Sequence, residues 1–270
     1  LVEPGLHARD PWPVYARLRA EAPVAWNETV GFWALSRHAE VLEVSTDPAR
    51  FCSGKGILTM EIGLEYPTPP TMMHTDPPAH TAYRKLVSPA FRPSVMAALE
   101  PVARARLVDL VDAIGPGETV DFVRTVSVPY PLRIIGDLLG LPDEDWEQFF
   151  YWSEVMVPGT LDLTPEQRAE VQAEMHAYFL DVIGQRRRAP GDDLISTLVG
   201  AELSDDELYM FLNQLLVAGN ETTRNTISGG LWALATNPDQ WQRLVDDRAL
   251  VPTAVEEVLR RQEPHTRIGQ

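Results

Sequence analysis

The sequence predicts a mostly α-helical protein with a small β region. Helical patterns follow one another from residue 77 onward, separated by short Pro/Gly breaks, and only one pair of strands is indicated, near the N-terminus. The composition, 44% hydrophobic and 23% charged over 270 residues, is that of a globular chain able to bury a sizeable core. No period of 20–50 residues repeats, which argues against a solenoid. We therefore expect one domain spanning residues 1–270.

The N-terminal region is predicted to hold two short helices around a hairpin. Trp12–Ala22 is amphipathic and has Pro in its first turn. Val24–Trp26 and Phe32–Leu35 flank a polar turn, as in a hairpin. Arg37–Ser45 resumes the helical pattern, and Cys52–Thr75 is rich in Gly, Pro and Thr and reads as a long loop.

The remainder is predicted as a series of helices bounded by Pro or Gly. The expected helices are Pro77–Ala90, Pro93–Ile114, Val126–Leu139, Asp143–Val157, Pro165–Arg188, Asp192–Gly200, Ser204–Thr236, Pro238–Asp246 and Thr253–Gln262.

The net charge of −16 disfavours nucleic acid and an anionic membrane surface as partners. Apolar stretches such as Leu212–Gly219 fall far short of a membrane span. Cys52 is the only cysteine, which excludes an internal disulfide and a cysteine-rich metal site and fits a reducing cytoplasm. The first residue is Leu1 and not Met, so we expect the chain to be incomplete at its start.

The sequence lacks the motifs of several common classes of enzyme. Phosphate-binding glycine loops, a Gly-x-Ser-x-Gly elbow, a His-Glu-x-x-His zinc helix and the di-iron Glu-x-x-His signature are all missing. The acid pairs Asp205-Asp206 and Asp246-Asp247 suggest a prenyl or terpene enzyme only weakly, because neither is followed by a further Asp for a magnesium cluster. The protein must use another cofactor, or none.

The first informative motif is Asp76-Pro-Pro-Ala-His80-Thr-Ala-Tyr-Arg84. Asp76 is a good N-cap residue and is followed by Pro77, which suits the first helical position. His80 and Arg84 are four residues apart, so they share one helix face and could hold an anionic group between them. The alternative is a solvated basic face on which His80 contacts Asp76.

The second motif lies in the middle of the long helix Ser204–Thr236, which opens with a capping box. Ala218-Gly219 would let a flat group approach the backbone, and Glu221-Thr222 place an acid and a hydroxyl beside it. The alternative is a helix–helix contact.

The third motif is the i,i+3 pair Glu257 and Arg260, which taken alone is a common surface ion pair.

The three motifs in this order resemble those of soluble bacterial members of the cytochrome P450 family. The matching stretches are DPPAHTAYRKLVSPAF, LLVAGNETT and AVEEVLRR, supported by DPWPVYARLRAEAPV near the start. The resemblance implies a helical prism with a small β region and a bound haem b. It also implies insertion of one oxygen atom from O₂ into a small or medium apolar substrate, with electrons from a ferredoxin or similar donor.

The resemblance assigns residues to the haem by position. His80 and Arg84 would bind one propionate, since cationic donors form charge-assisted hydrogen bonds to a carboxylate. Arg267 is the available candidate for the other propionate. Glu257 and Arg260 would lock the core on the haem side, a structural role.

The long helix would carry the catalytic pair. Ala218 and Gly219 would let it lie over the haem. Thr222 would hold dioxygen and its waters, and Glu221 would help relay protons.

The loop Cys52–Thr75 contains Met60, Met72 and Met73, which would help shape an adaptable substrate pocket. Core packing is the alternative for these side chains.

One departure from the family concerns the iron ligand. P450 haem is held by a Cys thiolate, in a loop after the Glu-x-x-Arg pair. Here the sequence stops at Gln270, and Cys52 lies upstream in a different context. We therefore expect a fragment, the first two-thirds of a P450, with no metal ligand in this chain and no turnover by this polypeptide. The alternative is a short, non-catalytic helical interaction module, and a cysteine loop in frame downstream would exclude it.

Overall fold

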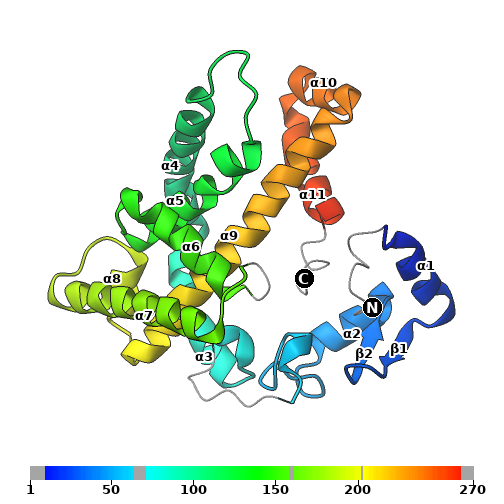
Figure 1. The fold of residues 1–270 in the computed structure, drawn as a ribbon, viewed down its shortest axis with the longest axis horizontal. Coiled ribbons are helices and arrows are strands. Elements are labelled where there is room, and N and C mark those ends of the chain that lie inside the picture. The colour runs from blue at the N-terminus through cyan, green and yellow to red at the C-terminus, as the bar shows by residue number, and fades with distance from the viewer. Residues whose placement is uncertain (1–9, 64–70, 158–160, 202, 263–270) are drawn as a thin grey trace. The chain divides into compact units, whose positions relative to one another are not determined.

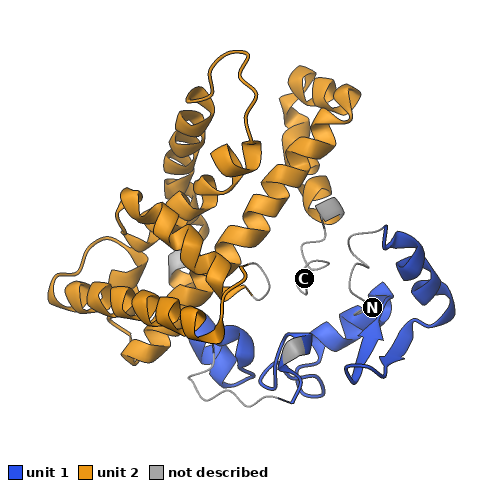
Figure 2. Cartoon of the chain, in the orientation of Figure 1, with its two compact units in different colours: residues 1–85, 266–269 blue, residues 86–265, 270 orange. Residues whose placement is uncertain are grey.

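The computed structural model of the chain describes residues 10–63, 71–157, 161–201 and 203–262 (Figure 1). The described residues form two compact units, one ending at Lys85 and the other beginning at Leu86 (Figure 2). The predicted mostly helical class with a small β region is confirmed. That the chain is a single domain stays a prediction.

The first unit begins with the predicted helix–hairpin–helix order. It contains α1 (Trp12–Glu21), the antiparallel strands β1 (Val24–Asn27) and β2 (Phe32–Leu35), and α2 (His38–Thr46). The register pairs Val24 with Leu35, and the turn closes at Gly31, whose φ of +82° favours glycine. In the described part of the long loop, two short 3₁₀ turns form, η1 (Thr59–Glu61) and η2 (Met72–His74). Helix α3 (Ala79–Val87) follows, and the division between the units falls within it.

The second unit is helical in its described part. Its long helix α9 packs against α5, α6, α7, α10 and α11, and Figure 1 shows it running along the unit. The elements in order are η3 (Ser88–Phe91), α4 (Pro93–Asp112), η4 (Val123–Ser127), α5 (Pro129–Leu139), η5 (Asp143–Asp145), α6 (Trp146–Met156), α7 (Pro165–Arg188), α8 (Leu194–Leu198), α9 (Asp205–Ala235), α10 (Pro238–Asp246), η6 (Arg248–Leu250) and α11 (Val251–Gln262).

The core of this unit is built where α5, α6, α7 and α9 meet. Large side chains from each of these helices are almost completely buried, and their apolar surface supplies most of the favourable free energy of folding. Examples are Leu132, Phe149, Trp152, Phe179 and Leu212.

Helix α9 begins where its capping box predicts. The Ser204 hydroxyl accepts a hydrogen bond from the Glu207 amide at 3.2 Å, and the Glu207 carboxylate accepts one from the Ser204 amide at 2.9 Å. This start fixes which α9 residues face the core.

The segment predicted as one helix over Val126–Leu139 is divided. Its start belongs to the π-helical turn η4, in which the Val128 amide donates to the Val123 carbonyl at 2.9 Å. Pro129 and Pro131 lack an N–H, so the regular i→i−4 bonds cannot form there. Helix α5 therefore begins at Pro129.

Candidate active site

The middle of α9 contains the predicted small and polar residues. Ala218 is exposed, Gly219 is half-buried, and Glu221 and Thr222 are half-buried. A Cβ atom on Gly219 would lie 2.8 Å from Ile135 Cδ1 of α5, closer than real Cβ contacts. The close approach seen at Gly219 is therefore to α5, as in the helix–helix contact considered above.

The two residues predicted to be catalytic, Glu221 and Thr222, differ in the hydrogen bonds that their side chains make. Thr222 donates its hydroxyl hydrogen to the Ala218 carbonyl oxygen at 2.8 Å, so its lone pairs stay available as acceptors. No hydrogen bond or ion pair joins the Glu221 carboxylate to another described residue. Within the described residues, the Glu221 carboxylate is thus available to bind water or a ligand.

Two polar α9 residues beside this pair, one buried and one half-buried, did not stand out in the sequence. Asn220 is 1% exposed and donates from Nδ2 to Ser153 Oγ of α6 at 2.8 Å. Arg224 donates from Nη1 to Glu154 Oε1, also on α6 and also at 2.8 Å. A buried Asn inside an apolar helical pattern is the signal that could have found this contact, since buried polar groups need partners.

Helix α3 brings His80 and Arg84 one turn apart in the first unit. His80 is half-buried and Arg84 is exposed. The N-cap expectation for Asp76 is wrong: α3 begins at Ala79, and the Asp76 carboxylate instead accepts hydrogen bonds from the amides of Ser53 and Gly54, at 2.8 and 3.0 Å. Asp76 thereby closes the base of the long loop and fixes the approach to α3.

A second contact organises this loop. The Glu61 carboxylate accepts hydrogen bonds from the amides of Ile57 and Leu58, at 2.7 and 2.9 Å, and pairs with His74 Nε2 at 3.2 Å. Thr71 Oγ1 lies 2.8 Å from the other ring nitrogen of His74. The loop is therefore a structured segment in its described part, and Met73 within it is exposed. The pocket role of Met60, Met72 and Met73 stays a prediction.

The third motif forms the expected ion pair on α11. Arg260 donates from Nε and Nη2 to the two Glu257 carboxylate oxygens, at 2.7 and 2.6 Å. Arg267 lies outside the described residues, and its role stays a prediction. Cys52 is exposed, in the first unit.

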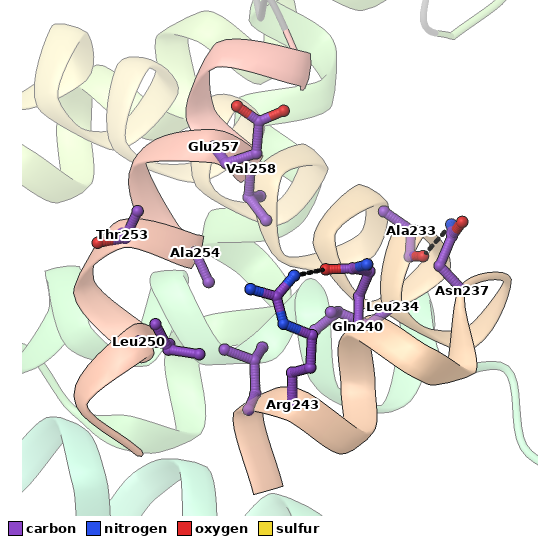
Figure 3. A pocket seen from close by; sticks show the side chains of 11 residues that line it. Ala233, Leu234, Asn237, Gln240, Arg243, Leu250, Thr253, Ala254, Glu257 and Val258 are labelled. Carbon is purple, nitrogen blue, oxygen red and sulfur yellow. Dashed lines mark hydrogen bonds between the residues drawn. The ribbon is translucent and has the colours of Figure 1, made fainter. Parts of the chain in front are cut away.

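A cavity of about 360 Å³ lies in the second unit, between the end of α9, α10 and α11 (Figure 3). Arg243 and Gln240 line it and are joined by a hydrogen bond of 2.9 Å, and Glu257 and Val258 approach it from α11. Neither Glu221 nor Thr222 lines this cavity, so it is separate from the candidate catalytic pair.

The weak magnesium hypothesis gains no support from the described residues. Asp205 pairs with Arg187 and Asp206 with His176, at helix surfaces. Within the described ranges no group of three or more His, Cys, Asp or Glu could hold a metal ion. Among the same residues, no helix combines the length and hydropathy of a membrane span.

Comparison with known proteins decides the family. The family model for cytochrome P450 matches residues 117–257. Linalool 8-monooxygenase of Pseudomonas putida is 36% identical over 98% of this chain and 70% of its own length. The chain belongs to the cytochrome P450 family. Vitamin D(3) 25-hydroxylase of Pseudonocardia autotrophica is also 36% identical, over 96% of this chain and 66% of its own length.

The P450 fold is also seen directly in solved structures. Substrate-free CYP109E1 from Bacillus megaterium matches with a TM-score of 0.83 and 34% identity, over 93% of this chain and 68% of that protein. This P450 chain therefore spans about two-thirds of the length of such relatives. Its named relatives are monooxygenases and hydroxylases, and the family implies a haem iron cofactor.

The residues present fit such a cofactor in their chemistry. The half-buried imidazole of His80 and the guanidinium of Arg84 supply donors of the kind that a propionate carboxylate accepts. The exposed Ala218 leaves the α9 backbone accessible beside Thr222. The two groups belong to different units, and their convergence on one haem stays a prediction.

Proposed function

We propose that this P450 is a haem-thiolate monooxygenase that inserts one oxygen atom from O₂ into a small or medium apolar organic substrate. Its membership of the family, over nearly the whole of the chain, is the observation that carries the proposal. The bound group is haem b, which when present supplies the activation of dioxygen.

The chain's own residues bind and orient that group and deliver protons. His80 and Arg84 hold one propionate by charge-assisted hydrogen bonds, and Arg267 holds the other. The exposed Ala218 keeps α9 slender where it passes over the ring, while the adjacent Gly219 lets the same segment approach Ile135 of α5. Thr222, whose hydroxyl already donates to Ala218, accepts a hydrogen bond from a water, and Glu221 passes protons to that water from solvent.

The printed names of relatives support a proposal for the class of substrate. Relatives carry the names linalool 8-monooxygenase and vitamin D(3) 25-hydroxylase, and one solved structure holds corticosterone. We infer that the substrate is an apolar terpenoid or steroid-like molecule, and that a ferredoxin or similar donor supplies electrons. The place of action is the cytoplasm. Because the named relatives are enzymes, we do not propose the non-catalytic interaction module.

The test uses the haem-loaded protein that carries this sequence, with electrons from a ferredoxin and its reductase. The measured quantity is the hydrogen peroxide formed per dioxygen consumed, without substrate, followed by product analysis with linalool and corticosterone. Thr222→Ala and Glu221→Gln should each raise the peroxide fraction and slow full reduction to water by roughly tenfold or more, since proton delivery is worth at least that factor.

Thr236→Ala is the matched control. Thr236 lies next to the end of the same helix and its hydroxyl makes the same kind of backbone bond, to Trp232 at 2.7 Å, far from the pair. An unchanged peroxide fraction in both Thr222→Ala and Glu221→Gln would refute the proposed roles.

A further inference from the structure

Two polar contacts join α6 to α9 on either side of the catalytic pair. One is the Asn220–Ser153 hydrogen bond and the other is the Arg224–Glu154 ion pair, each at 2.8 Å. We refer to these four residues as the α6–α9 clamp. Its α9 members are one helical turn apart and its α6 members are adjacent, so the same short stretch of each helix is held twice.

The Asn220 amide has a defined orientation in the clamp. Ser153 donates its hydroxyl hydrogen to the Phe150 carbonyl at 2.8 Å, so its oxygen is left as an acceptor for Asn220 Nδ2. Asn220 and Ser153 are 1% and 2% exposed, so water does not compete for this bond. Asn220 Oδ1 has no hydrogen-bond partner among the described residues. A hydrogen bond in such surroundings is directional and costly to leave unmade.

Arg224 strengthens the same contact. Its side chain and that of Glu154 are 15% and 14% exposed, and its guanidinium lies 5.7 Å from the centroid of the Phe150 ring. The Phe150 carbonyl thus accepts a hydrogen bond from the Ser153 hydroxyl, and the Phe150 ring contacts the Arg224 guanidinium. The two halves of the clamp therefore share one α6 residue.

Helical geometry relates the clamp to the positions of Glu221 and Thr222. Successive residues are rotated by about 100° around a helix axis. Gly219 faces Ile135 of α5, and Asn220 and Arg224 face α6. Glu221 and Thr222 therefore lie on other faces of α9, outside these contacts with α5 and α6.

We propose that Asn220 is a positioning residue, and that its buried bond to Ser153 sets the rotation of α9 that aims Glu221 and Thr222. This inference rests on the proposed function of that pair. Arg224 supports the same rotation, but its removal would leave the half-buried Glu154 carboxylate unpaired and destabilise the fold for that reason alone. Asn220 and Ser153 are therefore the residues to vary.

The decisive variant is the double substitution Asn220→Leu with Ser153→Ala. Leucine keeps the branched shape of asparagine, and replacing both polar partners together avoids an unsatisfied buried donor, so the fold is retained. The single variant Ser153→Ala leaves Asn220 Nδ2 unpaired and should lower the urea midpoint more than the double variant does. A lower urea midpoint in the single variant than in the double variant would show that the Asn220–Ser153 bond stabilises the haem-free chain.

Two readouts then test the aim of the pair. In the haem-free chain, amide hydrogen exchange over residues 218–224 should be at least fivefold faster in the double variant. In the haem-loaded protein, the peroxide formed per dioxygen should rise at least twofold and its dependence on pH should change. Tyr178→Phe is the control, because it removes a hydrogen bond of the same core that joins α7 to η5, the one from Tyr178 to Asp145 at 2.7 Å, and neither residue belongs to α9.

The outcomes separate the two proposals. If Thr222→Ala and Glu221→Gln raise the peroxide fraction but the double variant matches Tyr178→Phe in exchange and in peroxide, the positioning role of Asn220 is overturned and the function stands. If the catalytic variants have no effect, the proposed function fails first. A raised peroxide fraction with a changed pH profile in the double variant supports the positioning role.

Discussion

At the residue scale, polar side chains in this P450 are placed by partners far away in sequence. Tyr178 of α7 lies among Phe149, Trp152 and Phe179, and its hydroxyl donates to Asp145 at 2.7 Å. Burial, followed by that hydrogen bond to a carboxylate, raises the pKa of Tyr178 well above its usual range. The neutral phenol is therefore the form that the fold stabilises.

This pKa shift predicts how stability depends on alkaline pH. Because the folded-state pKa is raised, the contribution of Tyr178 is complete below about pH 10, the unfolded-state pKa, and is lost as the pH rises above it. Tyr178→Phe should cost about 1 kcal/mol at neutral pH, from the lost hydrogen bond, but should flatten the alkaline loss of stability. Urea unfolding from neutral to alkaline pH measures both. Some alkaline loss of stability should remain in Tyr178→Phe, because burial also raises the pKa of Tyr130 and Tyr209. If the free energy of unfolding fell equally steeply with pH in the two proteins, the prediction would be contradicted.

Single residues were predictable where a motif carried them. His80, Arg84, Glu221 and Thr222 stood out because their spacing matched a known pattern, and their roles stay predictions. Asp76 was misread, because its carboxylate binds amides 22 and 23 residues earlier and no local rule for helix caps describes that contact.

At the element scale, α9 is held by close contacts at glycines. Gly219 admits Ile135 of α5, and at Gly230 a Cβ would lie 2.9 Å from Val258 Cγ1 of α11. Glycine has a low helix propensity and therefore destabilises α9 locally. At these two positions it allows neighbouring helices to pack closely.

Gly219→Ala tests this exchange. In the wild-type background the added methyl meets Ile135 Cδ1, and overpacking of about 1–3 kcal/mol should outweigh the gain in helix propensity of about 1 kcal/mol. Ile135→Val removes that Cδ1 atom, so Gly219→Ala should be more favourable in the Ile135→Val background by about 1 kcal/mol or more. A double-mutant cycle from urea unfolding gives this coupling.

The control for that cycle is Gly184→Ala in α7. There a Cβ would make an ordinary 3.6 Å contact with the flexible Arg188 side chain, so the substitution should stabilise the protein by about 0.5–1 kcal/mol. Additive effects of the Gly219 and Ile135 substitutions would show that the two residues do not restrain each other.

Most elements were predictable because hydrophobic period, caps and Pro/Gly breaks agree. The predicted bounds of α7 and α10 coincide with those in the structure, and the hairpin lies where it was expected. The bounds of α3 and α5 were wrong near prolines, since the missing N–H removes bonds that periodicity alone cannot detect.

At the scale of the whole molecule, the helical class and the family were predictable from the sequence, whereas the convergence of His80, Arg84 and the middle of α9 on one haem stays a prediction. The polar contacts across helices, such as Asn220 with Ser153, join residues 67 positions apart and depend on packing that one sequence does not display. The elements, in contrast, depend on local patterns.

The cysteine content predicts the behaviour of a polypeptide made of these 270 residues alone. Its one thiol, Cys52, lies in the first unit in a context unlike the ligand loop of the family. After addition of haem, reduction and exposure to carbon monoxide, it should not give the red-shifted Soret band of thiolate-ligated haem. Cys52→Ser should leave the spectrum unchanged. A strong thiolate band that disappears in Cys52→Ser would show that this cysteine can serve as the ligand.

The π-helical turn η4 has a consequence for how the chain tolerates length changes. An i→i+5 turn contains one residue more than an α-helical path, so loss of a single residue between Val123 and Ser127 could be absorbed by conversion to ordinary helix. The same deletion inside α5 would rotate everything after it by about 100° and carry Ile135 away from Gly219. Natural deletions in descendants of this sequence should therefore accumulate in η4 and spare α5.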